Sequence, residues 1–374
     1  MIRVLVVDDS AFMRKLISDF LSAEQEIEVV GTARNGEDAL KRIKELNPDV
    51  VTLDVEMPVL NGTEALKQIL AEHDLAVIMV SSQTKQGKEL TIHCLELGAF
   101  DFVTKPSGSI SLDLHKVRGQ IVERVLAAGL SRKRTEKQVS PKPFMKPPSP
   151  IPAAAPRLQE VRSGSSLRKI ISIGTSTGGP RALQRVVTKL PKDIEAPILI
   201  VQHMPAGFTA SLATRLDHLS QITIKEAQDG DIAKNGVAYI APGGLNMSLH
   251  EQGAALVIRL SPEDTDSRHK PSVNYLFESI SNIKGYEKIA VIMTGMGSDG
   301  TEGVKKMVAS GHTKVIAEKE ESCVVFGMPK SVIKAGLAHE TRHVDDIAHA
   351  IISSMKKRGR EHVGCKPILR YLFR

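Results

Sequence analysis

Three side chains that could perform acyl transfer follow short apolar runs in the second half of the chain. They are Ser176, His203 and Asp299. The runs before them are Lys169–Ile173, Pro197–Val201 and Lys288–Met293. Because these runs are apolar throughout rather than alternating, they predict buried strands of a parallel sheet. Loops at the carboxyl ends of such strands converge on one crevice, where these three side chains would form a nucleophilic site.

The sequence around Ser176 supports a role as the nucleophile. The segment GTSTGG fits the pattern G-x-S-x-G and lies between a predicted strand and a helix that Pro180 would open. Backbone N–H groups at the start of that helix could stabilise an oxyanion. In this arrangement His203 takes the serine proton and Asp299 orients the imidazole. The chain order here is serine, histidine, aspartate, which differs from the orders in the α/β-hydrolases, chymotrypsin and subtilisin. We therefore expect a convergent site on a different type of sheet.

Each of these residues also has a simpler interpretation. A glycine-rich turn between a strand and a helix often holds a phosphate, although G-x-G-x-x-G is absent here. His203 could be a core histidine, and Asp299 could cap a turn or a helix. Ser298, in the same loop as Asp299, is a second possible nucleophile. The conjunction of three such residues at three strand ends favours the catalytic interpretation.

A second set of polar residues follows strand-like runs in the first half of the chain. Asp8 and Asp9 follow the first run, and the later runs end at Asp54, Ser81 and Lys105. Three carboxylates at one sheet edge need a neighbouring cation, which Mg²⁺ or the lysine could supply. With Mg²⁺ bound, Asp54 could attack a phosphoryl donor while Lys105 neutralises the developing charge.

The elements that position these residues predict two α/β domains. Residues 1–130 alternate strand and helix signals five times, which predicts a doubly wound parallel sheet of five strands. Its strand-like runs are 3–7, 27–33, 50–55, 76–82 and 101–105. Residues 168–352 resume the alternation and predict a parallel-sheet domain. Within it, Lys225–Leu260 is rich in glycine and short β-like runs, which predicts a β-hairpin insertion.

Between and after these domains lie two basic segments, which we interpret as a linker and a tail. The linker, residues 131–167, contains seven prolines between Pro141 and Pro156. Residues 131–170 carry ten Lys/Arg against two Glu, and the tail, 353–374, carries seven against one. The formal net charge of +7 therefore leaves the rest of the chain near −7. We expect solvated, flexible segments rather than nucleic-acid binding.

The remaining composition favours a cytoplasmic protein. No apolar run approaches the roughly 18 residues of a membrane span, and Asp8 and Asp9 interrupt the N-terminal run, so neither membrane insertion nor a signal peptide is expected. The three cysteines form neither a disulfide framework nor a zinc pattern. They are Cys94, Cys323 and Cys365.

The segment His339–His343 reads HETRH and fits the pattern H-E-x-x-H of zinc proteases. A zinc protease needs both histidines on one helix, one turn apart. Here Gly336 precedes the segment and Asp345 is placed to begin the next helix. The sequence therefore predicts a strand or a connection, in which the two histidines do not share a metal-binding face.

Together the motifs of the first half resemble those of response-regulator receiver domains over residues 1–125. The resemblance implies phosphotransfer from a histidine kinase, with Mg²⁺ held at Asp8 and Asp9 and the phosphoryl group accepted by Asp54. It also implies roles for three further residues in reading the phosphorylated state. They are the hydroxyl of Ser81, the aromatic switch residue Phe102, and Lys105, which precedes Pro106.

The second half resembles the catalytic domain of the chemotaxis protein-glutamate methylesterases, the CheB family. The resemblance is carried by the segments IGTSTGGPRAL, QHMP, YIAPGG, VIMTGMGSDG and FGMPK. It places that family's active-site serine, histidine and aspartate at Ser176, His203 and Asp299. Backbone N–H groups near Thr177 and Met296 are candidates for the oxyanion hole. The proline-rich linker and the C-terminal extension depart from the family pattern.

The resemblance implies a specific reaction and its control. The chain would hydrolyse glutamyl γ-methyl esters on chemoreceptors, releasing methanol, and would also deamidate receptor glutamines. A chemotaxis histidine kinase would phosphorylate the receiver with Mg²⁺, and the esterase reaction would need no cofactor. The unphosphorylated receiver would pack over the esterase cleft. Two other hypotheses are a phosphorylation-gated adaptor with a vestigial site, and a nucleotide-binding domain that uses the glycine-rich loops.

Overall fold

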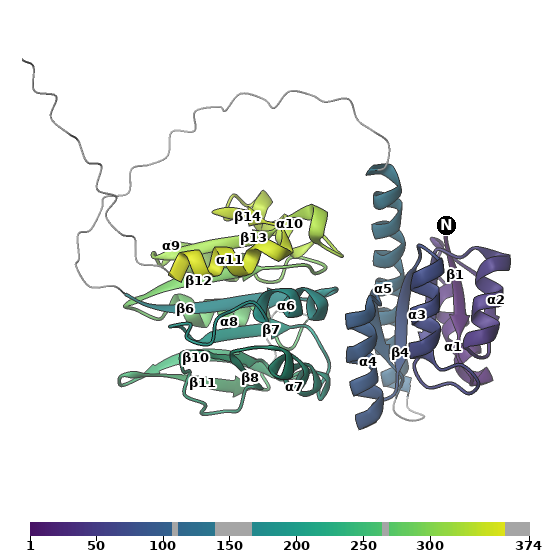
Figure 1. Ribbon diagram of the computed structural model, residues 1–374, viewed down its shortest axis with the longest axis horizontal. Coiled ribbons are helices and arrows are strands. Elements are labelled where there is room, and N and C mark those ends of the chain that lie inside the picture. The colour runs from purple at the N-terminus through teal and green to yellow at the C-terminus, as the bar shows by residue number, and fades with distance from the viewer. Residues whose placement is uncertain (107–110, 139–166, 264–268, 356–374) are drawn as a thin grey trace, which may run out of the picture.

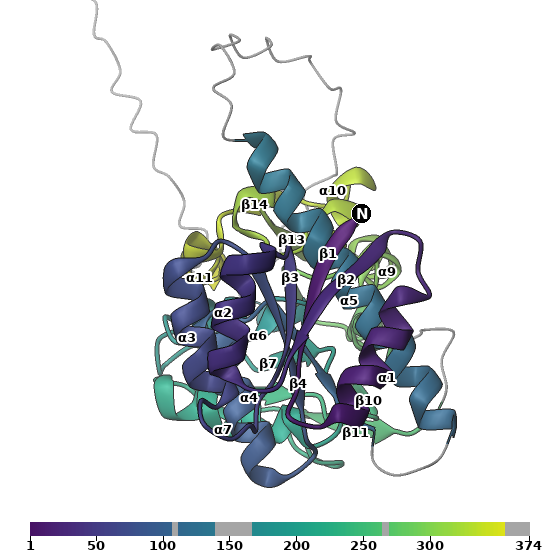
Figure 2. The ribbon, with the colours of Figure 1, turned by 90° about the vertical axis from the view of Figure 1, so that its right-hand side faces the viewer.

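The N-terminal domain is a parallel sheet with helices on both faces. The computed structural model describes residues 1–106, 111–138, 167–263 and 269–355. The strand order is β2-β1-β3-β4-β5. Helices α1 and α5 cover one face, and α2, α3 and α4 cover the other (Figure 2). In chain order the elements are β1 (Ile2–Val7), α1 (Ala11–Ser22), β2 (Ile27–Ala33), α2 (Gly36–Leu46), β3 (Val50–Asp54), α3 (Gly62–Glu72), β4 (Ala76–Ser81), α4 (Lys85–Leu97), β5 (Asp101–Thr104) and α5 (Ser111–Gln138).

Polar side chains fix where the first four helices begin. Each helix is preceded by a residue whose side-chain oxygen accepts a hydrogen bond from a backbone N–H of the first turn. These N-cap residues are Ser10, Asn35, Asn61 and Thr84. The caps end each loop at a fixed residue, so the loops that carry the acidic side chains stay short.

The C-terminal domain contains a seven-stranded, fully parallel sheet. The strand order is β14-β13-β12-β6-β7-β9-β8. The elements are β6 (Arg168–Thr175), α6 (Gly179–Val187), β7 (Ile198–Gln202), α7 (Phe208–Leu219), β8 (Thr223–Glu226), β9 (Val237–Ile240), β10 (Asn246–Gln252), β11 (Ala255–Ser261), α8 (Val273–Ser281), β12 (Tyr286–Ile292), α9 (Thr301–Ala309), β13 (Thr313–Glu318), the 3₁₀ turn η1 (Glu320–Ser322), α10 (Met328–Lys334), β14 (Glu340–Arg342) and α11 (Val344–Met355). The central strands β12, β6 and β7 are the three predicted apolar runs, and their side chains are buried almost throughout.

The predicted hairpin insertion is confirmed only in part. Strands β10 and β11 pair antiparallel as a separate two-stranded sheet. The strands before them, β8 and β9, instead extend the main parallel sheet. Because β8 and β9 have only four residues each, their pattern is too short to distinguish parallel from hairpin pairing.

The ends of the domains differ slightly from the predicted boundaries. Helix α5 continues to Gln138, eight residues beyond the predicted domain end at 130. The proline-rich part of the linker, 139–166, and the tail 356–374 lie outside the described residues. Among the described helices, none combines the length and the apolar character that a membrane span requires.

The two domains pack against each other, and helices α4 and α5 of the first domain face the second (Figure 1). Helix α4 contacts both α6 and α7. One buried apolar cluster contains residues of both domains, and the rings of Phe102 and Phe208 meet within it with centroids 4.6 Å apart. The domain contact is therefore built like part of a core.

Candidate active site

Ser176, His203 and Asp299 come together at the carboxyl ends of β6, β7 and β12. The Nδ1 atom of His203 lies 3.2 Å from the Oγ atom of Ser176. Its Nε2 atom lies 2.8 Å from the Oδ2 atom of Asp299. A neutral imidazole with its proton on Nε2 donates to Asp299 and leaves Nδ1 free to accept the serine proton. The geometry is that of a nucleophile, a base and an orienting carboxylate.

The Asp299 carboxylate is held at the start of helix α8. Besides His203, the hydroxyl of Ser272 and the backbone N–H groups of Val273 and Asn274 donate to it. Burial raises the pKa of a carboxyl group, but the hydrogen bonds from His203 and these N–H groups outweigh that effect and hold the pKa of Asp299 below its usual range. Asp299 therefore remains ionised and fixed in one orientation.

Two polar residues that the sequence analysis missed join the strand ends together. The side-chain amide of Gln202, which is buried, donates to the carbonyl oxygen of Ser176 and accepts from the Thr175 hydroxyl. Thr294 accepts the Ser176 N–H at its carbonyl oxygen, and its hydroxyl donates to the Thr177 carbonyl. These bonds fix the turn that carries Ser176 relative to the two neighbouring loops.

Glu318 lies directly behind Thr294 and was also missed. Its carboxylate accepts hydrogen bonds from the Thr294 N–H at 2.8 Å and from the Ser322 hydroxyl at 2.9 Å. The side chain is fully buried. Burial raises the pKa of Glu318, although these hydrogen bonds oppose the shift. A buried glutamate at the end of a strand gave no sequence signal, because its partners depend on the strand register.

The turn after Ser176 opens into helix α6 as predicted, with Pro180 in the first turn. Gly178 has φ 77°, a conformation that favours glycine, and an added Cβ would lie 2.5 Å from the Val324 side chain. The predicted oxyanion residues Thr177 and Met296 both line the cleft beside Ser176. Among the described residues, none accepts a hydrogen bond from the backbone N–H of either one. Both groups are thus available to a developing oxyanion.

A second imidazole, which the sequence did not reveal, lies against the catalytic one. The ring of His269 stacks on the ring of His203, with centroids 4.2 Å apart and an interplanar angle of 17°. His269 lines the same cleft. His269 precedes helix α8 and lies outside any helix or strand, and nothing in its spacing in the sequence indicated where it would lie.

The structure also shows where the residues of two other sequence hypotheses lie. Ser298 is exposed, and the histidine of the site pairs with Ser176 instead. Residues Glu340–Arg342 of the H-E-x-x-H segment form strand β14, in agreement with the prediction of a strand or a connection. The Nδ1 atom of His339 accepts the Val315 N–H.

The acidic residues of the N-terminal domain form the predicted pocket. Asp8 and Asp54 are buried and Asp9 is exposed, yet one carboxylate oxygen from each lies within 4.8 Å of the others. The Nζ atom of Lys105 lies 3.0 Å from Asp8 and 2.8 Å from Asp54. Three convergent carboxylates fit Mg²⁺, which prefers oxygen ligands.

The charges in this pocket are strongly coupled. Burial raises the pKa of Asp54 to about 6, against the opposing effect of Lys105. Burial disfavours the Lys105 ammonium, but the two carboxylates outweigh it and raise the pKa of Lys105. Three carboxylates face the single ammonium group of Lys105 at this edge, so a further cation would balance the remaining negative charge.

Ser81 connects the acidic pocket to helix α4. It lies at the end of β4, and its hydroxyl contacts the carbonyl oxygen of Gly87 at 3.2 Å. The hydroxyl of Thr91, one turn further along α4, donates to Ser81 at 2.6 Å. The sequence predicted Ser81 at this edge, whereas Thr91 was missed because it lies in a helix.

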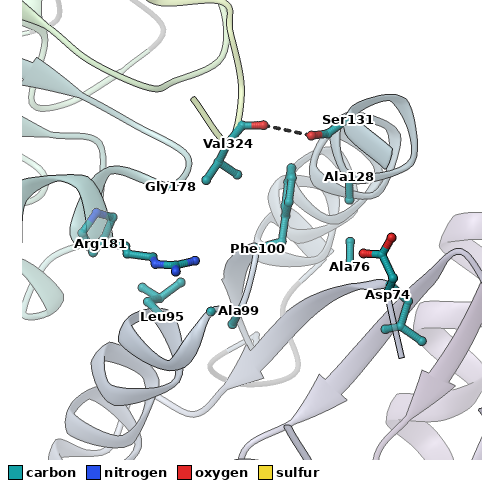
Figure 3. Close-up of a pocket in the computed structure, with 13 residues that line it drawn as sticks. Asp74, Ala76, Leu95, Ala99, Phe100, Ala128, Ser131, Gly178, Arg181 and Val324 are labelled. Atoms are coloured by element: carbon teal, nitrogen blue, oxygen red, sulfur yellow. Dashed lines mark hydrogen bonds between the residues drawn. The ribbon is translucent and has the colours of Figure 1, made fainter. Parts of the chain in front are cut away.

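The N-terminal domain reaches the active-site turn directly. The carboxylate of Asp101, at the start of β5, accepts a hydrogen bond of 2.7 Å from the Thr177 hydroxyl. Arg124 of α5 lies 3.4 Å from the same carboxylate. Phe102, the predicted switch residue, packs on Phe208 at the start of α7. Figure 3 shows the opposite rim of this contact, where the Ser131 hydroxyl donates to the Val324 carbonyl.

The fold and the site define the class of this protein: a serine hydrolase domain joined to a receiver domain. The sequence model of the CheB methylesterase family matches residues 171–351, and that of the response regulator receiver domain matches residues 4–115. The chain belongs to the CheB methylesterase family. Both resemblances found in the sequence are thereby confirmed.

Curated relatives match the chain over nearly its whole length. The protein-glutamate methylesterase/protein-glutamine glutaminase of Bacillus subtilis is 62% identical over 360 residues, which cover 96% of this chain and 99% of that protein. The protein of the same name from Bacillus licheniformis is 60% identical, with 96% and 99% coverage. The crystal structure of the Thermotoga maritima CheB methylesterase catalytic domain matches at 46% identity and a TM-score of 0.49, covering 50% of this chain and 98% of that one.

Proposed function

We propose that this protein removes methyl groups from glutamyl γ-methyl esters of chemoreceptors. The Oγ atom of Ser176 attacks the ester carbonyl while Nδ1 of His203 takes its proton. The oxyanion that forms accepts hydrogen bonds from the backbone N–H groups of Thr177 and Met296. When the tetrahedral intermediate collapses, the proton passes from His203 to the leaving oxygen and methanol departs.

The γ-glutamyl ester of Ser176 is then hydrolysed by the same groups. His203 removes a proton from water, which attacks the acyl carbonyl, and the proton returns to the Ser176 Oγ atom as glutamate is released. Asp299 stabilises the imidazolium in both steps. The same sequence acting on an amide would release ammonia, so we also propose deamidation of receptor glutamines.

The receiver controls this reaction through Asp54. Asp8 and Asp9, together with Asp54, would hold Mg²⁺, which supplies charge neutralisation when a histidine kinase or a small donor transfers its phosphoryl group. Lys105 stabilises the added negative charge. Ser81 is placed to follow the phosphoryl group, which would take its hydroxyl away from Thr91 and so shift α4.

In the unphosphorylated state the receiver restricts access to the esterase site. Helix α4 contacts α7, and Asp101 binds the hydroxyl of the residue next to the nucleophile. A shift of α4 and β5 would weaken both contacts at once. Phosphorylation then acts as the bias on a two-state domain contact.

The observation that carries the proposal is the assembled set of Ser176, His203 and Asp299, at 3.2 and 2.8 Å, beside a docked receiver. Methanol release from methyl-labelled chemoreceptor membranes, with and without acetyl phosphate and Mg²⁺, tests it. We expect release that the donor stimulates. Ser176→Ala should lower it by at least ~10⁴-fold, and Asp54→Ala should remove only the stimulation.

Retained release in Ser176→Ala would exclude the proposed nucleophile. Ser298→Ala is the matched control, because it removes a hydroxyl from the same cleft without touching His203, and it should keep its activity. If Ser298→Ala were the inactive variant, the roles of the two serines would be reversed. Measuring the ammonia that is released from receptor glutamines tests the deamidase activity in parallel.

A further inference from the structure

The docked receiver leaves the catalytic groups in a competent arrangement. The two hydrogen-bond distances through His203 are those of a functioning serine hydrolase, and Asp299 keeps all its donors. Ser176 remains partly exposed with the receiver in place, and the side chain of His203 is 8% exposed. Docking of the receiver therefore leaves the hydrogen bonds between Ser176, His203 and Asp299 in place.

The space in front of the site is lined by both domains, and none of the residues that the structure describes fills it. A cleft of about 880 Å³ lies between α5 and the catalytic residues. On one side it is lined by Gly119, Gln120, Glu123 and Arg124 of α5, and on the other by Ser176 and His203. Clefts of roughly 300–1,000 Å³ hold small organic ligands. A methyl ester of a single glutamyl unit fits within this volume.

A protein substrate needs much more space around the site than a small ester does. A specific protein–protein contact covers about 800 Å² on each partner, and a helix is itself about 10–12 Å across. Helix α5 lines the cleft across from Ser176 and His203, so a partner of that size could not lie over these residues while α5 is in place. A second, smaller pocket of about 180 Å³ lies in the domain contact beside Phe100 and Arg181 (Figure 3).

The contact between the receiver and the active-site turn does not involve the atoms that take part in the reaction. Asp101 binds the side-chain hydroxyl of Thr177, whereas the oxyanion site uses the backbone N–H of that residue. In the described part of the chain, this N–H has no acceptor while the receiver is docked. The receiver thus blocks the approach to the site and leaves the reaction itself possible.

We infer that the docked receiver is a size filter: the unphosphorylated protein hydrolyses small carboxylic methyl esters at its full rate and excludes only protein substrates. This inference rests on the proposed function. It extends the activity to low-molecular-weight γ-glutamyl methyl esters, which would be cleaved whether or not Asp54 is phosphorylated.

Methanol release from the γ-methyl ester of N-acetylglutamic acid α-amide tests the inference on the full chain. We expect acetyl phosphate and Mg²⁺ to change kcat/KM for this ester less than twofold, while they raise release from receptor membranes at least tenfold. Equal stimulation of both substrates would overturn the inference, as would failure to cleave the small ester by protein that demethylates receptors. Failure of the proposed function would appear separately, as no release from receptors in either state.

A substitution at Gly119 tests the geometry independently. Gly119 lines the cleft, and a Cβ added there meets nothing within 4 Å, so a side chain can begin at this position without a clash. Gly119→Trp should lower small-ester kcat/KM at least fivefold in the unphosphorylated protein, and the phosphodonor should restore it. Gly119→Ala, the matched control, should behave like the unsubstituted chain. Equal activity of the Trp and Ala variants would show that the cleft is not the route to Ser176.

Discussion

At the scale of single residues, the proposed Mg²⁺ site makes metal binding depend on the protonation state of Asp54. Its pKa of about 6 means that a proton competes with Mg²⁺ for the carboxylate as the pH falls through that value. Above pH 7 the group is ionised, and at pH 5 about one tenth of it is. We therefore expect the Mg²⁺ dissociation constant to rise about tenfold between pH 7 and pH 5. Isothermal titration calorimetry of the full chain measures it.

Asp54→Asn is the control for this effect, because the amide keeps the shape of the side chain and has no proton to lose. Its Mg²⁺ affinity should be weaker at every pH, and the step centred near pH 6 should disappear. A step of the same size in Asp54→Asn would assign the titration to another group in the pocket.

The reactive residues could be predicted from the sequence because each one combines a reactive side chain with a position at the end of a strand. Asp54, Ser176 and His203 are polar residues at the ends of apolar runs, and parallel strands bring such ends together. Thr294 and Glu318 could not be predicted in the same way. Each is an ordinary polar residue whose importance comes from one buried partner, and the sheet register decides which partner that is.

At the scale of elements, the contact between β5 and α7 includes one aromatic pair. Phe102 and Phe208 are both buried, with ring centroids 4.6 Å apart. Such a pair is worth about 0.5–1.5 kcal/mol beyond its buried area. Phe102→Leu keeps the apolar character and loses the pair, so demethylation of receptors without a phosphodonor should rise about two- to tenfold.

Phe20→Leu is the matched control, since Phe20 lies on α1, on the face of the receiver sheet that α1 and α5 cover. It should lower the thermal stability of the receiver and leave demethylation without donor unchanged. Equal increases in both variants would mean that general loosening of the receiver, and not the aromatic pair, controls access. Methanol release and the melting temperature of each variant distinguish these outcomes.

The strands could be predicted from the sequence where a run of apolar residues was long enough and ended at a polar residue. The five receiver strands begin and end within about a residue of the predicted runs, because each combines apolar residues with a polar stop. The strands β8 and β9 were instead assigned to a hairpin. Four residues carry too little periodicity to indicate pairing partners, and the parallel pairing of β9 with β7 depends on contacts distant in sequence.

At the scale of the whole molecule, the relative placement of the two domains could not be predicted from either half. Both sequence patterns specify a complete α/β domain, and neither contains its partner's surface. Docking brings together residues such as Asp101 and Thr177, which lie 76 positions apart and belong to separate motifs. Regulation therefore depends on contacts that only the assembled chain shows.

An ion pair across this contact offers a direct test of docking. The Nε atom of Arg215, in α7, lies 2.8 Å from the carboxylate of Glu96, in α4. Because the arginine is 45% exposed, the pair itself is worth at most ~1 kcal/mol. Glu96→Arg and Arg215→Glu each place like charges in contact, so either should raise receptor demethylation without donor about two- to fivefold.

The double variant Glu96→Arg/Arg215→Glu restores opposite charges in reversed order. If docking of α4 on α7 limits access, its demethylation without donor should return towards that of the unsubstituted chain, and the stimulation by acetyl phosphate should recover. Hydrolysis of the small γ-glutamyl ester should be the same in all four proteins. Additive increases in the double variant would show instead that each substitution acts within its own domain, and the contact between α4 and α7 would lose its regulatory role.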